Sequence, residues 1–206
     1  MKKLLIIAFI FLFNLQNFLC QEIGNKQTTN FMTQHVKKKY PAYDFSNFIY
    51  VGIENQKLIL INNGEIIKSY DISTSKEGTG NKNNSSKTPI GLHKIKSKYG
   101  KGVPIGGIFD HRKFNGNIAE INLDTNSTRE DIICTRIIRI EGLENGLNKG
   151  GNVDSYLRKI YIHGTNEEGL IGQEASHGCI RMKNSDIVDL FDRVKKDMLL
   201  VLLDSL

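Results

Sequence analysis

The sequence predicts a mainly β domain that carries one well-defined helix. Short runs of β-branched, aromatic and aliphatic residues recur between residues 48 and 203, and clusters of Asn, Gly and Ser separate them. Only one segment, after residue 183, repeats its apolar residues at the helical spacing. The stretch is long enough for one domain with a hydrophobic core, and it contains no internal repeat.

The N-terminal segment has the pattern of an export signal. A charged start is followed by an apolar run over residues 4–13, which is shorter than a membrane span requires. We assign residues 1–20 to an export signal or an uncleaved N-terminal anchor and expect the protein in the periplasm or cell-wall space. Residues 21–46 are polar and are expected to form a linker with at most one short helix. Residues 47–204 then form the folded domain.

The composition indicates which partners to expect. The formal net charge is +6, and two of the lysines belong to the first three residues. A charge of this size favours weak association with an anionic wall or membrane surface. The chain has no basic stripe interleaved with aromatic residues, so nucleic acid is not expected to be a partner.

The three cysteines do not form a disulfide framework. Cys20 falls at the end of the predicted signal. Cys134 follows Ile132 and Ile133 in an apolar, strand-like run, where a cysteine behaves as a small hydrophobic residue. Cys179 lies in a polar segment that contains glycine, histidine and arginine, where a thiol is reactive. We expect two free thiols rather than a bridge between Cys134 and Cys179.

The first strands of the domain are expected at Phe48–Val51 and Lys57–Ile61. Asn63-Gly64 predicts a tight hairpin turn, because both residues readily adopt positive φ angles. Glu65–Tyr70 is expected to return as the partner strand. The Ser73–Lys87 segment, rich in small polar residues, is expected to be a solvated loop rather than a binding element.

Extended structure is expected to resume at Thr88–Leu92, because Pro89 favours β geometry in the residue before it. Four glycines predict a mobile loop over residues 100–107. The helix is expected to have Asn184 or Ser185 as its N-cap. Its apolar face comprises Ile187, Val188, Leu190, Phe191 and Val194. Further strands are expected at Ile118–Leu123, Ile132–Ile140, Lys159–His163 and Met198–Leu203.

The candidate catalytic groups are a cysteine and a histidine from separate segments. Cys179 is the candidate nucleophile, because a thiolate attacks carbonyl carbon once a nearby imidazole has taken its proton. Alternation along the preceding strand directs His163 away from Ile160 and Ile162, toward a groove or solvent. His163 is therefore the candidate base, whereas His177 is expected to support the site or contact the substrate.

Two further residues complete the candidate site. Gly178 allows a sharp bend before the nucleophile, and its amide, with that of Cys179, is expected to donate to a developing oxyanion. Arg181 is expected to hold a substrate carboxylate. The alternative for this arginine is an ion pair with Asp186 or Asp189 on the helix.

These residues form a recognisable pattern. Ile162-His163-Gly164-Thr165, a spacer, and then Ser176-His177-Gly178-Cys179-Ile180-Arg181-Met182 resemble the catalytic signature of L,D-transpeptidases of the YkuD type. The resemblance extends over residues 47–204 and implies a β-sandwich-like fold. It also implies that His163 is the base, that the Gly164 carbonyl orients it, and that the loop with Ser176 and His177 lines the substrate site. Tyr161 is expected on the groove side of its strand.

The resemblance implies a peptidoglycan substrate and no cofactor or metal. Cys179 would attack the stem tetrapeptide after its third residue, form a thioacyl-enzyme and transfer the acyl group to an amine. A carboxypeptidase or a hydrolase that releases stems or wall-bound protein uses the same residues and stays open. Two alternatives from a different functional class are less favoured. One is a zinc site formed by His163, His177 and Cys179, and the other is an inactive wall-binding module. We expect a monomer.

Overall fold

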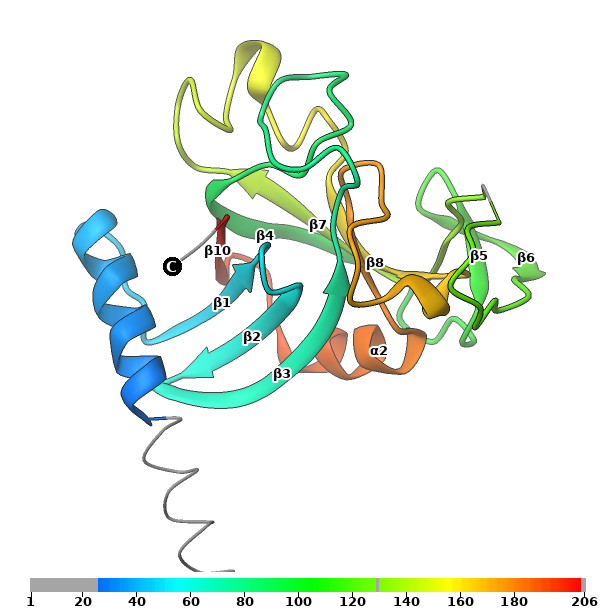
Figure 1. The fold of residues 1–206 in the computed structure, drawn as a ribbon, viewed down its shortest axis with the longest axis horizontal. Helices are drawn as coiled ribbons and strands as arrows, with labels where there is room; N and C mark the ends of the chain where they lie inside the picture. The colour runs from blue at the N-terminus through cyan, green and yellow to red at the C-terminus, as the bar shows by residue number, and fades with distance from the viewer. Residues whose placement is uncertain (1–25, 129, 205–206) are drawn as a thin grey trace, which may run out of the picture.

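The computed structural model describes residues 26–128 and 130–204 (Figure 1). The predicted export signal, residues 1–20, lies outside the described residues. In the described part, no helix is long and apolar enough to cross a membrane. The strands are β1 (Asn47–Gly52), β2 (Lys57–Asn62), β3 (Glu65–Ser73), β4 (Gly91–Tyr99), β5 (Gly107–Asp110), β6 (Lys113–Ile118), β7 (Ile133–Gly142), β8 (Tyr161–Thr165), β9 (Ile180–Met182) and β10 (Leu199–Leu203).

Eight of these strands form a closed sheet. They pair in the order β4-β10-β1-β2-β3-β9-β8-β7, and β7 pairs again with β4. The hairpin of β5 and β6 extends the sheet outward from β7. The prediction of a mainly β domain of this type is confirmed, and the two facing layers of the sandwich are parts of one continuous sheet. Closure leaves no free edge within the ring.

The main core fills the interior of the ring. Strand alternation directs Ile49 and Val51 of β1 inward, together with Leu200 and Leu202 of β10. The α2 helix (Asn184–Arg193) adds its apolar face to the same core. That face contains the predicted residues Ile187, Leu190 and Phe191, followed by Val194, while Val188 is only half-buried.

The cap of α2 differs from the prediction. Lys183 occupies the N-cap position and makes no side-chain cap bond. The Asn184 N–H instead donates to Glu168 Oε1 at 2.7 Å, and the Asn184 side chain bonds Glu168 and the Thr165 carbonyl. The first turn of the helix is therefore capped by a carboxylate from a distant loop, which suits the positive end of a helix.

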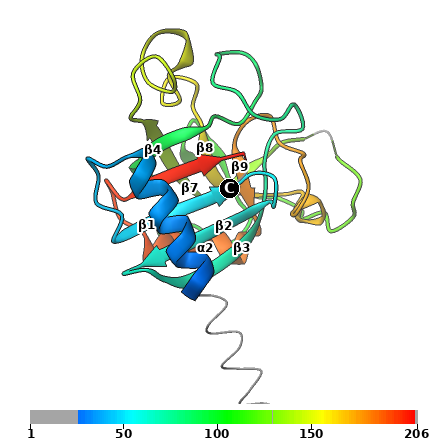
Figure 2. The same ribbon diagram turned by 60° about the vertical axis from the view of Figure 1, so that its left-hand side comes forward.

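A second core lies on the outer face of the sheet, beneath a helix that occupies residues 26–39 (Figure 2). Met32, Val36 and Tyr40 of this segment pack against Phe48 and other outward-facing strand residues. The sequence analysis expects a linker here, and the structure differs because the apolar residues are three or four positions apart and share one helix face. This segment contributes to the core rather than only connecting to it.

Two further differences concern the middle of the chain. The strand expected at Ile118–Leu123 is wrong, because β6 ends at Ile118 and the chain then forms a loop in which the Asn122 N–H donates to the Asn166 carbonyl. The β5–β6 hairpin was not expected. All six residues of β6 are exposed, so the strand has no buried face and no apolar alternation to reveal it.

The buried helix face gives a stability prediction. Met32, on the buried face of the 26–39 helix, is 3% exposed, whereas its neighbour Phe31 is 59% exposed. We expect Met32→Ala to lower the free energy of unfolding by about 2–3 kcal/mol, because it leaves a cavity in the second core. Phe31→Ala is the matched control and should change it by less than about 0.5 kcal/mol. Urea denaturation of the full chain measures both; equal effects would mean that the helix does not stabilise the domain.

Candidate functional site

The parallel pairing of β8 with β9 assembles the site. Ile162 pairs with Ile180, and His163 pairs with Arg181. The two isoleucines are fully buried in the main core. Because side chains alternate along a strand, His163 and Arg181 lie on the opposite, outer face. Cys179 lies one residue before β9.

The His163 ring is held in one orientation and one tautomer. Its Nδ1 lies 2.8 Å from the Gly164 carbonyl oxygen. Since a carbonyl only accepts hydrogen bonds, Nδ1 carries the proton and Nε2 is left as the basic nitrogen. Burial lowers the pKa of His163, against the opposing effect of Asp131, so the ring is neutral at pH 7.

Gly164 is required by close packing. A Cβ at this position would lie 2.4 Å from Asn184 Oδ1 and 2.8 Å from the Cys134 carbonyl oxygen. The same Asn184 Oδ1 accepts hydrogen bonds from the Thr135 hydroxyl and the Cys134 thiol. The residue that carries the orienting carbonyl is thus clamped between β7 and the start of α2.

The Cys179 thiol is protonated at rest. The residue is partly exposed, and its Sγ donates to the Lys159 carbonyl at 3.7 Å. Burial raises the pKa of Cys179 to about 12, although Arg181 and Arg158 favour the ionised form. Both described cysteines are free, as expected, and burial also raises the pKa of Cys134 to about 12. Cys134 is fully buried in β7, so of the two cysteines that the structure describes only Cys179 is accessible.

The turn before Cys179 is shaped by Ser176 and Gly178. The buried Ser176 Oγ donates to the Cys179 carbonyl at 2.6 Å and accepts the Gly178 N–H at 3.2 Å. Gly178 has a φ of 115°, a region that favours glycine. Ser176 was expected to contact substrate and the Gly178 amide to bind an oxyanion; in the structure both groups bond to each other and hold the turn.

The segment expected to be a solvated loop packs against this turn. Ser75 forms a β-bridge with Ser176, and the Lys76 N–H donates to the Ser176 carbonyl at 3.1 Å. A Cβ on Gly178 would lie only 3.1 Å from the Lys87 carbonyl oxygen. Residues 75–87 therefore pack over the turn formed by residues 176–179, and the expectation of a purely solvated loop is wrong.

Arg181 is enclosed by two carboxylates. It is 1% exposed; Nη1 lies 2.9 Å from Glu167 Oε2 and Nη2 lies 2.8 Å from Asp131 Oδ1. The sequence analysis expected a substrate carboxylate or the helix acids at this arginine. The structure pairs it instead with acids from two loops, which neutralise its charge within the protein.

Asp131 links three of the candidate residues. Its carboxylate accepts from His177 Nδ1 at 3.0 Å, pairs with Arg181 and acts electrostatically on His163. Burial opposes its ionisation, but Arg181 and the two histidines hold the pKa of Asp131 at about 2. Sequence analysis missed this residue, because nothing in the Glu130-Asp131 pair distinguishes it from an ordinary acidic loop.

Tyr161 and His177 have different surroundings. Tyr161 is buried, and its hydroxyl accepts from Arg112 Nη1 at 3.2 Å. The His177 side chain is 52% exposed. It borders a cavity of about 340 Å³ that is also lined by Lys76, Thr125, Ser127, Leu170, Gln173, Glu174 and Ala175. In the described residues, no group of three or more His, Cys, Asp or Glu side chains is arranged to hold a metal ion.

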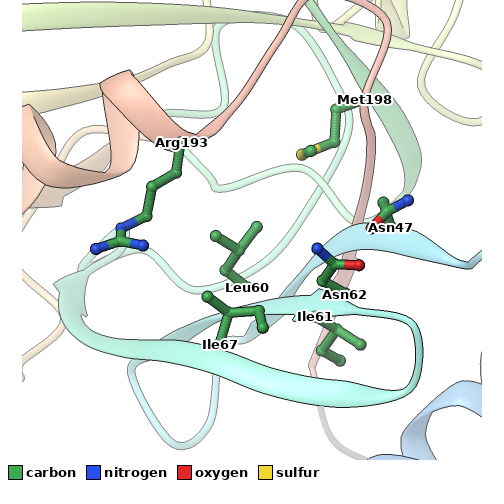
Figure 3. Close-up of a pocket in the computed structure, with 7 residues that line it drawn as sticks. All are labelled: Asn47, Leu60, Ile61, Asn62, Ile67, Arg193 and Met198. Carbon is green, nitrogen blue, oxygen red and sulfur yellow. The ribbon is translucent and has the colours of Figure 1, made fainter.

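Another cavity, of about 210 Å³, lies between the β2–β3 hairpin and the end of α2 (Figure 3). Its lining residues are Asn47, Leu60, Ile61, Asn62, Ile67, Arg193 and Met198. None of the candidate catalytic residues contributes to it.

Comparison with known proteins identifies a family. The model of the YkuD family, described as the L,D-transpeptidase catalytic domain, matches residues 46–202. Over 40 residues the chain is 50% identical to the probable L,D-transpeptidase YbiS of Escherichia coli, which covers 19% of this chain and 13% of that protein. Over 37 residues it is 51% identical to the putative L,D-transpeptidase YqjB of Bacillus subtilis, covering 18% and 21%. The chain thus spans a small part of these relatives.

Solved structures with a related description share little sequence with this chain. An Enterococcus faecium L,D-transpeptidase is 18% identical, with a TM-score of 0.46, covering 77% of this chain and 50% of the other. A Mycobacterium smegmatis L,D-transpeptidase is 16% identical, with a TM-score of 0.46, covering 77% and 58%.

The position of Asp131 predicts a pH-dependent contribution to stability. Because the pKa of this carboxyl is lowered on folding, the carboxylate stabilises the protein above about pH 4, and this stabilisation is lost as the pH falls toward 2. We expect Asp131→Asn to lower the free energy of unfolding at pH 7 by about 2 kcal/mol.

Urea denaturation between pH 7 and pH 3 measures this effect, and the gap between the two proteins should shrink at the acidic end. Asp192→Asn, on the exposed side of α2, is the control and should leave the stability unchanged. A gap that stays constant with pH would mean that the Asp131 carboxylate is not ionically coupled to its neighbours.

Proposed function

Because the chain belongs to the YkuD family of L,D-transpeptidase catalytic domains, we propose that it is a peptidoglycan L,D-transpeptidase with Cys179 as its nucleophile. The observation that carries this proposal is the His163 ring, whose Nδ1 is bound to the Gly164 carbonyl. The Nε2 of this ring is the proposed base for the Cys179 thiol, which lies one residue before the neighbouring strand β9.

The first half-reaction forms the acyl-enzyme. Both the thiol and the imidazole are neutral at rest. His163 Nε2 therefore takes the Cys179 proton as the sulfur attacks the carbonyl carbon of the third stem residue. The new C–S bond leaves an alkoxide, for which the Cys179 N–H is the proposed donor. The alkoxide re-forms the carbonyl, the C–N bond breaks, and the protonated His163 gives its proton to the departing amine of the terminal D-residue.

The second half-reaction transfers the acyl group. An acceptor amine attacks the thioester carbonyl and gives a proton to His163. The C–S bond then breaks, and His163 returns a proton to the Cys179 thiolate. When water is the acceptor, the same steps yield a shortened stem, which is the carboxypeptidase alternative. In both cases His163 acts as base and acid in turn, so its neutral resting state suits each half-reaction.

Asp131 and the residues that it binds support the proposed roles of His163 and Cys179. Asp131 holds His177 and Arg181 and favours protonation of His163 after it has taken the cysteine proton. The cavity beside His177 is the proposed entry for the stem peptide. The proposed site of action is the periplasm or cell-wall space, to which residues 1–20 would direct the protein as a signal or anchor. We propose that it acts as a monomer with weak attraction to the anionic wall.

A covalent probe tests the nucleophile. Incubation with a carbapenem should add the mass of one intact molecule, because ring opening by the thiol expels nothing. The adduct should be absent from Cys179→Ala and retained by Cys134→Ala, which removes only the buried thiol. Intact-protein mass spectrometry distinguishes the three proteins. A folded, reduced wild-type protein that remains unmodified would refute the assignment of Cys179.

A tetrapeptide stem with an amine acceptor tests the reaction. We expect release of the terminal D-residue and a crosslinked product, and His163→Gln should lower kcat by about 10²- to 10⁴-fold because the proton-transfer group is lost. Mass spectrometry of the products separates transfer from hydrolysis. Near-normal turnover in His163→Gln would contradict the base role, and shortened stems alone would identify a carboxypeptidase.

A further inference from the structure

Arg158 lies close to the nucleophile and has no role in the proposed function. Its Nη1 donates to the Gly80 carbonyl at 3.1 Å, and its Nη2 donates to the Lys87 carbonyl at 2.5 Å. The Lys87 carbonyl is the group that lies against Gly178, one residue before Cys179. The residue after Arg158 supplies the carbonyl that accepts the Cys179 thiol. Arg158 therefore binds residues 80–87 at Lys87, the point where this segment meets the turn before Cys179.

The charge of Arg158 is not neutralised by an acid. Both of its hydrogen-bond partners are carbonyl oxygens, and no ion pair joins it to a carboxylate of the described residues. Arg181 differs, because Asp131 and Glu167 balance its charge. Because this half-buried guanidinium is bound only to carbonyls, no neighbouring carboxylate offsets its positive charge.

A nearby cation favours the ionised form of the Cys179 sulfur. In the resting thiol, Cys179 donates to the Lys159 carbonyl, and this bond is lost when the thiol ionises. A backbone hydrogen bond from Tyr161 favours the thiolate, Asp131 acts against it, and Arg181 and Arg158 act for it. Asp131 and Glu167 pair with Arg181, whereas no carboxylate pairs with Arg158, so its contribution to the thiolate is not offset by a bound acid.

We propose that Arg158 stabilises the Cys179 thiolate by its uncompensated positive charge and holds residues 80–87 against the turn that presents the sulfur. It is a positioning and electrostatic residue and takes no proton itself. The inference rests on the proposed nucleophile and adds a second cationic residue, beyond the recognised motif, on which that nucleophile depends.

Alkylation of Cys179 by iodoacetamide tests this role, because the thiolate displaces iodide without any stem peptide or acyl acceptor. All proteins carry Cys20→Ser and Cys134→Ala, so that Cys179 is the one thiol left to react. Arg158→Gln should react about tenfold more slowly at pH 8, equivalent to one unit in the thiol pKa. The gap should stay near tenfold between pH 8 and pH 11, because the pKa of the Cys179 thiol, about 12, lies above this range and the thiolate is the minor form in both proteins.

Two variants separate charge from structure. Arg158→Lys keeps the cation but cannot reproduce both guanidinium bonds, and it should retain most of the wild-type rate. Arg193→Gln, on the exposed end of α2, is the control for loss of a distant charge and should match the wild type. Equal losses in Arg158→Lys and Arg158→Gln, or a rate in Arg158→Gln equal to that of the wild type, would overturn the electrostatic role.

The outcome is separate from that of the proposed function. A carbapenem adduct that forms normally while Arg158→Gln alkylates like the wild type refutes only the role of Arg158. Absence of the adduct, with slower alkylation of Arg158→Gln than of the wild type, refutes the transpeptidase proposal and leaves the coupling of Arg158 to Cys179 standing.

Discussion

The parallel pairing of β8 with β9 is the constraint on which the site depends. It lies within a closed ring of strands, so neither strand can shift without moving core residues such as Ile162 and Ile180 out of the interior. One register therefore fixes both the packing of the core and the position of His163 beside Arg181 on the outer face. The ring also explains why a three-residue strand such as β9 keeps a defined position, since it is paired on both sides by β3 and β8.

Charge is balanced locally around this face. Arg181 is fully buried, and a buried guanidinium without acids would be strongly unfavourable. Asp131 and Glu167 supply those acids from separate loops, and Glu167 is held in turn by Ser127 and Thr128. The result is a near-neutral scaffold in which thiol and imidazole are both uncharged. In the proposed mechanism, proton transfer from the thiol to the imidazole creates an ion pair only during the reaction.

The sequence was sufficient for the local parts of this arrangement. Cys179, His163 and the strands that carry them are contiguous patterns, and alternation alone indicated that His163 faces away from Ile162. Asp131 and Arg158 could not be found in this way, because their significance comes from loops that meet only after folding. The same reason applies to the 75–87 segment, whose small polar residues read as solvated although they form bridges and hydrogen bonds with the nucleophile turn.

Asn184 shows how far the site and the fold share the same residues. The sequence offered it as a simple helix cap, but its side chain joins three elements at once. It donates to the Thr165 carbonyl in β8 and to Glu168, and it accepts from the Thr135 hydroxyl in β7. Its oxygen is also the atom that leaves no room for a side chain at residue 164. The start of α2, the end of β8 and the carbonyl that orients His163 are thus held by one buried amide. A change that loosens the helix at this end would therefore also release the histidine, so stability and reactivity are coupled at this point of the structure.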